Sequence, residues 1–220
     1  MGKNKLFKFA QLETFSNVIQ HPFGAERFDQ PFKGRWNQDF FKTARPITLE
    51  IGCGKGEYTV GLARKHPERN FIGIDMKGNR IYVGAKAALD EGLDNVGFLR
   101  TQAEHLPHFF APGEVSEIWV TFPDPKPKKG DTRKRLTSKE NNARYREMMA
   151  DDGVVHLKTD SDFNVEFTLE VIRESGLEIL RYSNDIDRDF PGDELVNIRT
   201  YYEGLFREKG FAIKLISYKP

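Results

Sequence analysis

The stretch PITLEIGCGKGEY, residues 46–58, decides the fold class of this chain. Its first half is a short apolar run of the kind that forms a buried strand, and three glycines follow at alternating positions, Gly52, Gly54 and Gly56. Glycine lets the backbone turn tightly and approach a ligand closely. A helix is predicted directly afterwards, from Glu57 to about Lys65. The stretch is therefore a strand, a glycine turn and a helix.

The same alternation of strand and helix continues along the chain. Further strands are predicted at 71–75, 96–101, 117–122, 154–159, 178–182 and 211–217, and helices at 78–91, 138–150, 162–174 and 198–208. This alternation is typical of a parallel sheet with right-handed crossover connections. We therefore predict an α/β fold with a mostly parallel seven-stranded sheet, in which the last strand is antiparallel.

Length, charge and cysteine content restrict the class of protein. The 220 residues suit one α/β domain, which we place at 46–220. Because the formal net charge is only +1, any affinity for nucleic acid must come from a local cluster of basic residues. The one cysteine, Cys53, excludes a disulfide framework and fits a reducing, cytoplasmic location. Residues 1–20 have no long apolar run, so neither a signal peptide nor a membrane span is predicted.

Residues 1–45 are predicted to form an irregular arm that is rich in aromatic side chains, with a helical pattern only at 37–43. The simplest interpretation is that these rings pack on the domain. The alternative is an arm that contacts RNA through stacked rings or through Lys3, Lys5 and Lys8.

The glycine turn favours a nucleoside ligand without phosphates. A dinucleotide site has the pattern G-x-G-x-x-G with the pyrophosphate at the helix N-terminus, whereas here the third glycine comes one position early. Glu50, just before the turn, would repel a pyrophosphate. S-adenosylmethionine fits better, because it carries an amino group and a sulfonium and has no phosphate.

Two more polar residues stand at the ends of the next predicted strands. Asp75 ends the second strand, where a carboxylate can accept both ribose hydroxyls, and Gln102 ends the third, where an amide could reach the adenine edge. Taken singly, Glu50 could be a strand-end acid with a local partner and Asp75 a helix cap. Their occurrence at successive strand ends after a glycine turn favours the nucleoside site.

A second unusual stretch, WVTFPDPKPKKGDTRKR at residues 119–135, begins within the fourth predicted strand. Its three prolines fix φ and restrict the residues before them, so Asp124 is held on a stiff turn. Six basic residues follow within ten positions, Lys126, Lys128, Lys129, Arg133, Lys134 and Arg135. The stretch thus joins a rigid carboxylate to a positive field suited to phosphate. The alternatives are an ordinary turn residue and a solvated loop.

Together these motifs resemble the tRNA (guanine-N7-)-methyltransferase family in its single-chain bacterial form. The similarity runs from about residue 46 to the C-terminus and is carried by LEIGCGKG, FIGID, FPDPKPKK, the RKR at 133–135, HLKTD at 156–160 and RTYYE at 199–203. It implies a Rossmann-like class I S-adenosylmethionine-dependent methyltransferase fold, and transfer of a methyl group to N7 of the guanosine at position 46 in the variable loop of tRNA. The expected partner is tRNA. No membrane or obligate protein partner is indicated, and a monomer or homodimer is expected.

The resemblance also implies roles for individual residues. Cofactor positions fall on Glu50, Gly52, Gly54, Asp75 and Gln102, and Asp124 falls on the catalytic aspartate at the edge of the same site. Substrate positions fall on Lys128, Asp160, Thr200, Tyr201, Tyr202 and Glu203, and the RNA-contacting segment includes Arg133, Lys134 and Arg135. The chain departs from the family where Gln102 replaces a common acid, Lys126 a common tryptophan, and Gly130-Asp131 a common Arg-His pair.

The chemistry explains the need for carboxylates. Guanine N7 carries a lone pair and no proton, so the nucleophile needs no general base. The product ring is positively charged, and Asp124 is predicted to stabilise that charge as it develops. A carboxylate can also accept guanine N1–H and N2–H₂ together, so Asp160 or Glu203 is predicted to discriminate guanine from adenine. The alternatives are that Asp160 caps the helix that begins near residue 162 and that Glu203 is a solvated helix acid.

Two other functions stay open on the sequence alone. One is a methyltransferase that acts on another RNA, a protein or a small molecule, which explains the glycine turn but not the RKR run. The other is a non-catalytic RNA-binding module, against which the intact turn with Glu50 and Asp75 speaks. No Cys/His cluster has the spacing of a metal site, and His156, in the middle of a strand, is expected to be a core residue.

Overall fold

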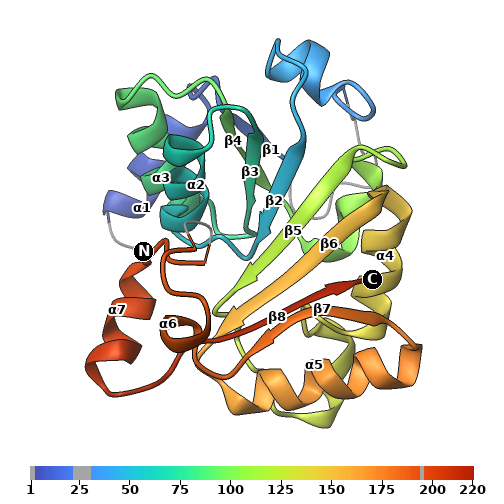
Figure 1. Ribbon diagram of the computed structural model, residues 1–220. Helices are drawn as coiled ribbons and strands as arrows, with labels where there is room; N and C mark the ends of the chain where they lie inside the picture. The colour runs from blue at the N-terminus through green and yellow to red at the C-terminus, as the bar shows by residue number, and fades with distance from the viewer. Residues whose placement is uncertain (1–2, 22–30, 194–195) are drawn as a thin grey trace.

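Eight strands form one sheet in the computed structural model, which describes residues 3–21, 31–193 and 196–220 (Figure 1). The strands are β1 (Val18–Gln20), β2 (Ile47–Ile51), β3 (Asn70–Ile74), β4 (Val96–Arg100), β5 (Val115–Thr121), β6 (Met149–Thr159), β7 (Glu178–Ser183) and β8 (Lys214–Lys219). Their order is β1-β4-β3-β2-β5-β6-β8-β7. Strand β8 pairs antiparallel with both β6 and β7, and the other pairings are parallel. The predicted mostly parallel sheet with an antiparallel last strand is confirmed.

The predicted count of seven strands is wrong by one, because β1 lies within the N-terminal arm. Its three residues pair with β4, with Val18 opposite Phe98 and Gln20 opposite Arg100. Three residues are too few for an alternating pattern to be recognised in the sequence. The side chains of Lys3 and Lys5 and all of residues 22–30 lie outside the described residues, so RNA contact by this part of the arm stays a prediction.

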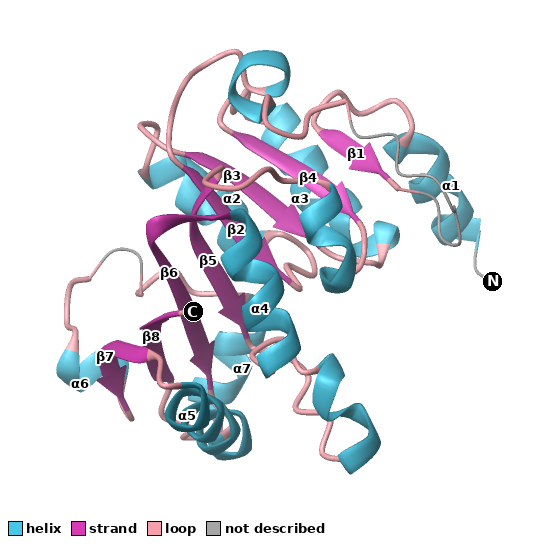
Figure 2. Cartoon of the chain, turned by 90° about the vertical axis from the view of Figure 1, so that its right-hand side faces the viewer, coloured by secondary structure: helices cyan, strands magenta, loops and turns pink. Residues whose placement is uncertain are grey.

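Helices cover both faces of the sheet (Figures 1 and 2). They are α1 (Lys3–Leu12), α2 (Glu57–Lys65), α3 (Gly78–Asp90), α4 (Lys139–Met148), α5 (Asp162–Ser175), α6 (Ile186–Asp189) and α7 (Tyr201–Glu208), with short 3-10 or π turns η1 (Trp36–Phe40), η2 (Ala103–His108) and η3 (Lys129–Lys134). Among the residues that the structure describes, none of the helices is long and apolar enough to cross a membrane.

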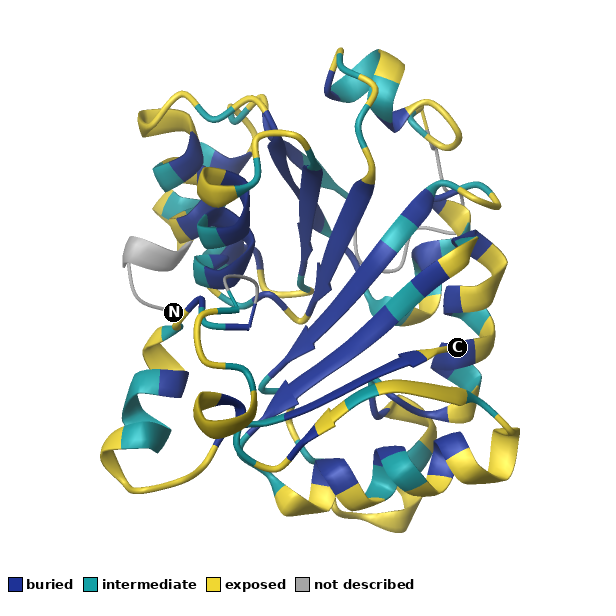
Figure 3. Ribbon diagram, in the orientation of Figure 1, coloured by how far each residue is buried: buried dark blue, intermediate teal, exposed yellow. Residues whose placement is uncertain are grey.

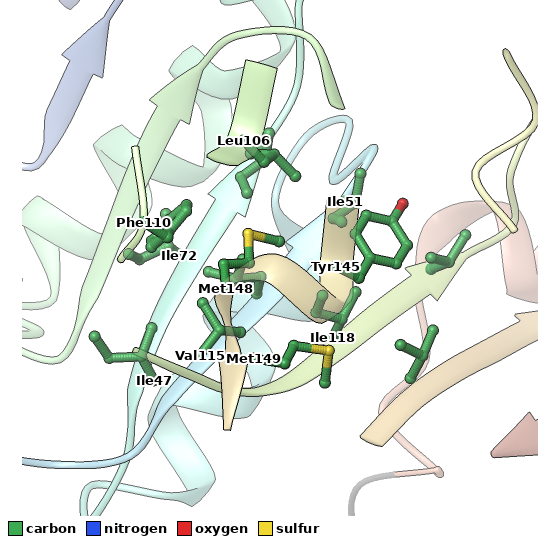
Figure 4. Close-up of a cluster of buried hydrophobic side chains, with 14 of the residues drawn as sticks. Ile47, Ile51, Ile72, Leu106, Phe110, Val115, Ile118, Tyr145, Met148 and Met149 are labelled. Atoms are coloured by element: carbon green, nitrogen blue, oxygen red, sulfur yellow. The ribbon is translucent and has the colours of Figure 1, made fainter. Parts of the chain in front are cut away.

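Two hydrophobic cores hold these layers together. One core joins α4, α5, Trp36 and Phe40 of η1, Leu106 of η2, and Phe109 and Phe110 after η2 to one face of the sheet. Figure 4 shows part of it, where Tyr145 and Met148 of α4 lie beside Ile51 and Ile118 of the strands. The second core joins α1, α2, α3 and the side chains of Ile186, Val196 and Ile198 to the opposite face. Strands β2 and β3 are therefore buried along their whole length (Figure 3), as expected for a parallel sheet covered on both faces.

The bounds of some helices follow from the local sequence pattern, and those of others are set by a capping side chain. Helix α2 has the predicted bounds, whereas the helix predicted from residue 198 begins at Tyr201. Thr200 sets this start, because its hydroxyl oxygen accepts a hydrogen bond from the Glu203 backbone N–H at 3.2 Å. The elements α1, α6, η2 and η3 were not predicted; α6 spans only 4 residues, and η2 and η3 only 6 each.

Most of the described aromatic residues of the arm contact the rest of the chain. The buried Trp36 indole N–H donates to the Phe109 carbonyl oxygen at 2.8 Å, and Phe15 stacks on Tyr82 with ring centroids 5.5 Å apart. Phe7 differs, because 59% of it is exposed. The division into an arm at 1–45 and a domain at 46–220 stays a prediction.

Candidate active site

Five predicted site residues stand at the same edge of the sheet, because each ends or follows a strand of its parallel part. Across the order β4-β3-β2-β5-β6, they are Gln102, Asp75, Glu50, Asp124 and Asp160. From β2 the chain continues to β3 and β4 on one side, whereas β5 and β6 lie on the other. The carboxyl ends of β2 and β5 therefore flank a topological switch point, which is where open α/β sheets bind ligands.

The glycine turn between β2 and α2 needs all three of its glycines. Gly52, Gly54 and Gly56 have φ values of 81°, 58° and 73°, a region that other residues rarely adopt. The third glycine also has a packing role, since a Cβ on Gly56 would lie 2.6 Å from the Phe98 ring and 3.2 Å from the Gly84 Cα. The early third glycine therefore brings α2 against α3 and β4, while Gly52 and Gly54 shape the turn itself.

Asp75 closes the glycine turn from the next strand. One of its carboxylate oxygens accepts the Gly54 backbone N–H at 3.0 Å, and the other accepts the Lys77 N–H at 2.7 Å. The local role and the predicted ligand role are compatible, because an ionised carboxylate has about four acceptor sites. Gln102, which follows β4 and precedes η2, has a half-buried side chain. Ligand contacts by both residues stay predictions.

Glu50 is a buried carboxyl group beside the turn, with only 3% of the residue exposed. One oxygen accepts the backbone N–H of Thr59 at 2.9 Å and also the Thr59 hydroxyl, and the other accepts the Thr121 hydroxyl at 2.6 Å. Burial raises the pKa of the Glu50 carboxyl to about 7, and the charge of Asp75 adds to this effect. A nearby cation would lower that pKa and favour the ionised form.

Glu50→Gln is expected to change the pH dependence of stability. The pKa of about 7 in the folded chain exceeds the ordinary value of 4.5, so the stabilisation is present below pH 4.5 and lost as the pH rises through 7. From Glu50 alone, the free energy of unfolding should fall by about 2–3 kcal/mol between pH 5 and pH 8. Glutamine can keep the hydrogen bonds to both threonines but does not ionise. Urea unfolding at the two pH values measures the effect, and equal pH dependence in both proteins would contradict it.

The turn that carries Asp124 is strained. Phe122 and Lys126, each followed by proline, have φ values of 47° and 45°, which cost about 1–3 kcal/mol each for residues other than glycine. Asp124 itself is exposed, and one of its carboxylate oxygens accepts the Lys126 backbone N–H at 3.3 Å. The sequence prediction of a stiff, non-repetitive turn after β5 agrees with this geometry. Persisting strain of this kind clusters at functional sites.

Most of the basic segment that follows is exposed. Lys128, Lys129, Arg133 and Lys134 are exposed, on and just before the short η3 turn. Arg133 lies 3.1 Å from a Glu140 carboxylate oxygen, and Lys134 lies 2.8 Å from one of Asp131. Exposed pairs of this kind contribute little stability. These cations can therefore exchange their partners for phosphates.

Arg135 does not share this exposure, and its predicted role in RNA contact requires correction. Only 8% of the residue is exposed, and its guanidinium group donates to the Lys126 carbonyl oxygen. A charge already buried and hydrogen-bonded is not available to a phosphate. In the sequence, nothing distinguishes it from its two basic neighbours.

Asp160 follows β6 and is half-buried, and burial raises the pKa of its carboxyl group. Its predicted alternative role as a helix cap is wrong, because Ser161 caps α5 by accepting the Asn164 backbone N–H at 3.3 Å. Lys214 donates to the Asp160 backbone carbonyl oxygen at 2.9 Å and thus fixes this strand end. Substrate contact by the Asp160 carboxylate stays a prediction.

Glu203 is not placed to contact a substrate, which corrects its predicted role. The residue is fully buried, and its carboxylate lies 2.8 Å from the Lys158 ammonium nitrogen and 2.8 Å from a guanidinium nitrogen of Arg207. The predicted alternative, a solvated helix acid, is also wrong, because Glu203 is not exposed to solvent. Sequence reasoning missed Lys158, although a lysine near the end of a strand predicted to be buried on both faces is an available signal.

The start of α7 adjoins the glycine turn. The Tyr201 backbone N–H donates to a Glu57 carboxylate oxygen at 2.6 Å, and the Lys55 ammonium group lies 4.9 Å from the centroid of the Tyr201 ring. The rings of Tyr201 and Tyr202 are exposed, at 57% and 50%. The structure thus brings the 200–202 segment, predicted to contact substrate, beside the predicted cofactor turn.

This chain is similar in sequence to known methyltransferases. Residues 44–215 match the model of a family described as "Putative methyltransferase". The chain is 50% identical to the tRNA (guanine-N(7)-)-methyltransferase of Christiangramia forsetii over 99% of this chain and 98% of that protein. It is 46% identical to the protein of the same name from Bacteroides fragilis, over 99% of this chain and 86% of that one.

Solved structures agree on the fold. The 16S rRNA methyltransferase KamB superposes with a TM-score of 0.63 and 18% identity, over 87% of this chain and 95% of that chain. A 16S rRNA (adenine(1408)-N(1))-methyltransferase from Catenulisporales acidiphilia, solved with its cosubstrate SAM, superposes with a TM-score of 0.54 and 14% identity, over 84% and 88% of the two chains.

Proposed function

Because the chain belongs to the tRNA (guanine-N(7)-)-methyltransferase family, we propose that it transfers a methyl group from S-adenosylmethionine to N7 of a guanosine in tRNA. The observation that carries this proposal is the strained turn holding Asp124 next to β2 and the glycine turn, at the switch point of the sheet. The guanosine at position 46 in the variable loop is the proposed target.

The residues around the glycine turn fit S-adenosylmethionine. Glu50 supplies a buried carboxyl group that a cationic ligand would ionise, and this group would disfavour a pyrophosphate. Asp75 keeps acceptor sites for ribose hydroxyls beyond its two backbone hydrogen bonds. When bound, S-adenosylmethionine supplies an electrophilic methyl group on a sulfonium. Glu50, Gly52, Gly54, Asp75 and Gln102 would hold it, with Asp124 at the border to the substrate.

The role of the chain in the reaction is electrostatic and orienting. N7 of guanine attacks without losing a proton, so Asp124 need not act as a base. Its carboxylate would stabilise the positive charge that grows on the purine ring. With Glu203 neutralised by Lys158 and Arg207, Asp160 is the remaining candidate to accept guanine N1–H and N2–H₂. Alignment of the two substrates would supply the rest of the rate enhancement.

Neutralising the four exposed cations Lys128, Lys129, Arg133 and Lys134 with glutamine should weaken tRNA binding and flatten its salt dependence. Each lost phosphate contact should reduce the slope of log K against log salt by about 0.9. Fluorescence titrations of tRNA binding at several salt concentrations measure this slope. A control variant changes four exposed cations elsewhere, Lys42, Lys86, Arg146 and Arg173. If both variants kept the wild-type slope, the basic segment would be a solvated loop.

The proposed activity is tested by incubating an unmodified tRNA transcript with methyl-labelled S-adenosylmethionine and identifying the methylated nucleoside. We expect 7-methylguanosine, and no labelling of a transcript with adenosine at the target position. A different methylated nucleoside would favour another RNA specificity. Binding of the labelled cofactor without methyl transfer to any tRNA would favour the non-catalytic RNA-binding alternative.

A further inference from the structure

Arg135 is joined to the turn that carries Asp124 rather than to solvent. Its guanidinium Nε and Nη2 donate to the same carbonyl oxygen, that of Lys126, at 3.2 and 3.1 Å. The guanidinium carbon lies 4.7 Å from the ring centroid of Phe163 and 4.4 Å from that of Phe167. These two rings are four residues apart on α5, so they present one surface to the guanidinium group.

The backbone of Arg135 is also fixed. Its carbonyl oxygen accepts the side-chain amide of Asn141 at 2.8 Å, and its N–H donates to the Thr132 carbonyl oxygen at 3.2 Å. Asn141 belongs to α4 and is buried. Arg135 therefore connects two helices, α4 through its backbone and α5 through its guanidinium group, to a single carbonyl oxygen in the turn.

That carbonyl oxygen belongs to the residue that also contacts Asp124. Lys126 has the strained φ of 45°, and its N–H donates to the Asp124 carboxylate at 3.3 Å. On the other side of Asp124, the buried Asn164 donates its side-chain amide to the Pro123 carbonyl oxygen at 3.0 Å. The turn is thus held on both sides of the carboxylate, which is how a strained backbone persists.

We propose that Arg135 is a positioning residue for Asp124 and that it does not bind the phosphates of tRNA. The inference rests on the proposed function of the site. Its neighbour Arg133 provides the contrast, because 85% of the Arg133 side chain is exposed, whereas Arg135 is buried with two guanidinium nitrogens donating to one carbonyl oxygen. A lysine at position 135 would keep the positive charge. It could not donate two N–H groups of one planar guanidinium to the Lys126 carbonyl oxygen, and it has no planar group to stack on the two rings.

The test compares Arg135→Lys with Arg133→Lys and Arg133→Met in single-turnover methylation at saturating tRNA and cofactor. Arg135→Lys should slow the reaction by about 10- to 100-fold, the scale of a small misplacement of a catalytic group. Its tRNA dissociation constant should stay within about twofold of wild type, with an unchanged salt slope. Arg133→Met should weaken tRNA binding and lower the salt slope, and Arg133→Lys should keep the wild-type slope. Because lysine would keep a phosphate contact at either position, the salt slope is also measured in Arg135→Met, and a reduction equal to that of Arg133→Met would overturn the proposal.

A double-mutant cycle with Asp124→Asn separates positioning from an independent effect. If Arg135 acts through Asp124, adding Arg135→Lys to Asp124→Asn should slow the reaction by less than about twofold further. If the rate loss of the double variant equalled the product of the two single-variant losses, the proposal would be overturned. Wild-type rates in Arg135→Lys, with Asp124→Asn impaired, would overturn it and leave the proposed function intact. Wild-type rates in Asp124→Asn would overturn the catalytic role of Asp124 and, with it, this inference.

Two further variants guard against a general loss of folding. Asn164→Ala removes the hydrogen bond on the other side of Asp124 and should show the same lack of additivity with Asp124→Asn. Arg181→Lys is a matched control, because Arg181 also stacks on a ring, Phe190 at 4.1 Å, and pairs with Asp193 at 2.6 Å. It should lower the melting temperature without changing the single-turnover rate. Equal rate losses in Arg181→Lys and Arg135→Lys would overturn the proposal.

Discussion

Asp124→Asn is expected to slow single-turnover methylation of tRNA by about 10²–10³-fold, the usual cost of removing one preorganised electrostatic partner. Asparagine can preserve the turn, since its side-chain oxygen can still accept the Lys126 backbone N–H that Asp124 accepts at 3.3 Å. What it removes is the negative charge beside a purine that becomes cationic. Because that charge appears only as N7 is alkylated, tRNA binding should change little.

Rapid-quench measurements with enzyme in excess over tRNA give the chemical step directly. Asp162→Asn is a suitable control, because Asp162 is an exposed acid near the same sheet edge, 2.9 Å from Lys214, and should give wild-type rates. A rate for Asp124→Asn within threefold of wild type would remove Asp124 from the catalytic role and direct attention to Asp160.

Lys158→Met is expected to lower the free energy of unfolding by about 3–5 kcal/mol, because it leaves a buried carboxylate without one of its two cations. Lys158 and Glu203 are both fully buried, and their charged atoms lie 2.8 Å apart. Lys158 also donates to the carbonyl oxygens of Val196 and Ile198, which would lose their donor. The burial that lowers the pKa of Lys158 makes this pair costly to break.

The double variant Lys158→Met with Glu203→Leu should recover part of this loss, since it removes the buried ion pair. The recovery is partial because two carbonyl oxygens lose their donor and Arg207 keeps only Asp187 as a partner. Urea denaturation midpoints at constant slope measure the differences. Lys86→Met provides the exposed comparison, because Lys86 pairs with Asp90 on the surface of α3 and should cost less than about 1 kcal/mol. A double variant no more stable than the single one would show that the buried charge is not the source of the loss.

The backbone of the site could be predicted from the sequence because its signals are local. A glycine turn after an apolar run gives the bounds of α2, and alternating strands and helices place Asp75 and Asp124 at one sheet edge. The short strand β1 is different, because its pairing with β4 depends on contacts between distant parts of the chain. Three residues carry no periodicity of their own.

The roles of charged side chains were harder to predict, since burial is decided by tertiary contacts. Arg133 and Arg135 stand two positions apart in one basic run, yet one is a surface cation and the other packs against two phenylalanine rings. Glu203 was predicted to contact substrate, with a solvated helix acid as the alternative, because its buried partner Lys158 is 45 residues away in the sequence. Both misassignments concern residues whose local sequence resembles that of a solvated segment.

The position of β8 has a consequence for how the chain folds during its synthesis. Strand β7 lies at the edge of the sheet and is joined to it through β8, which is synthesised after every other strand yet lies between β6 and β7. While the nascent chain is being extended, strands β1 to β6 can pair with one another. Strand β7 cannot join the sheet until β8 is synthesised, because β8 is the strand that pairs with both β6 and β7. Strand β7 carries exposed apolar side chains, Ile179, Leu180 and Tyr182, so an unpaired β7 is prone to aggregation.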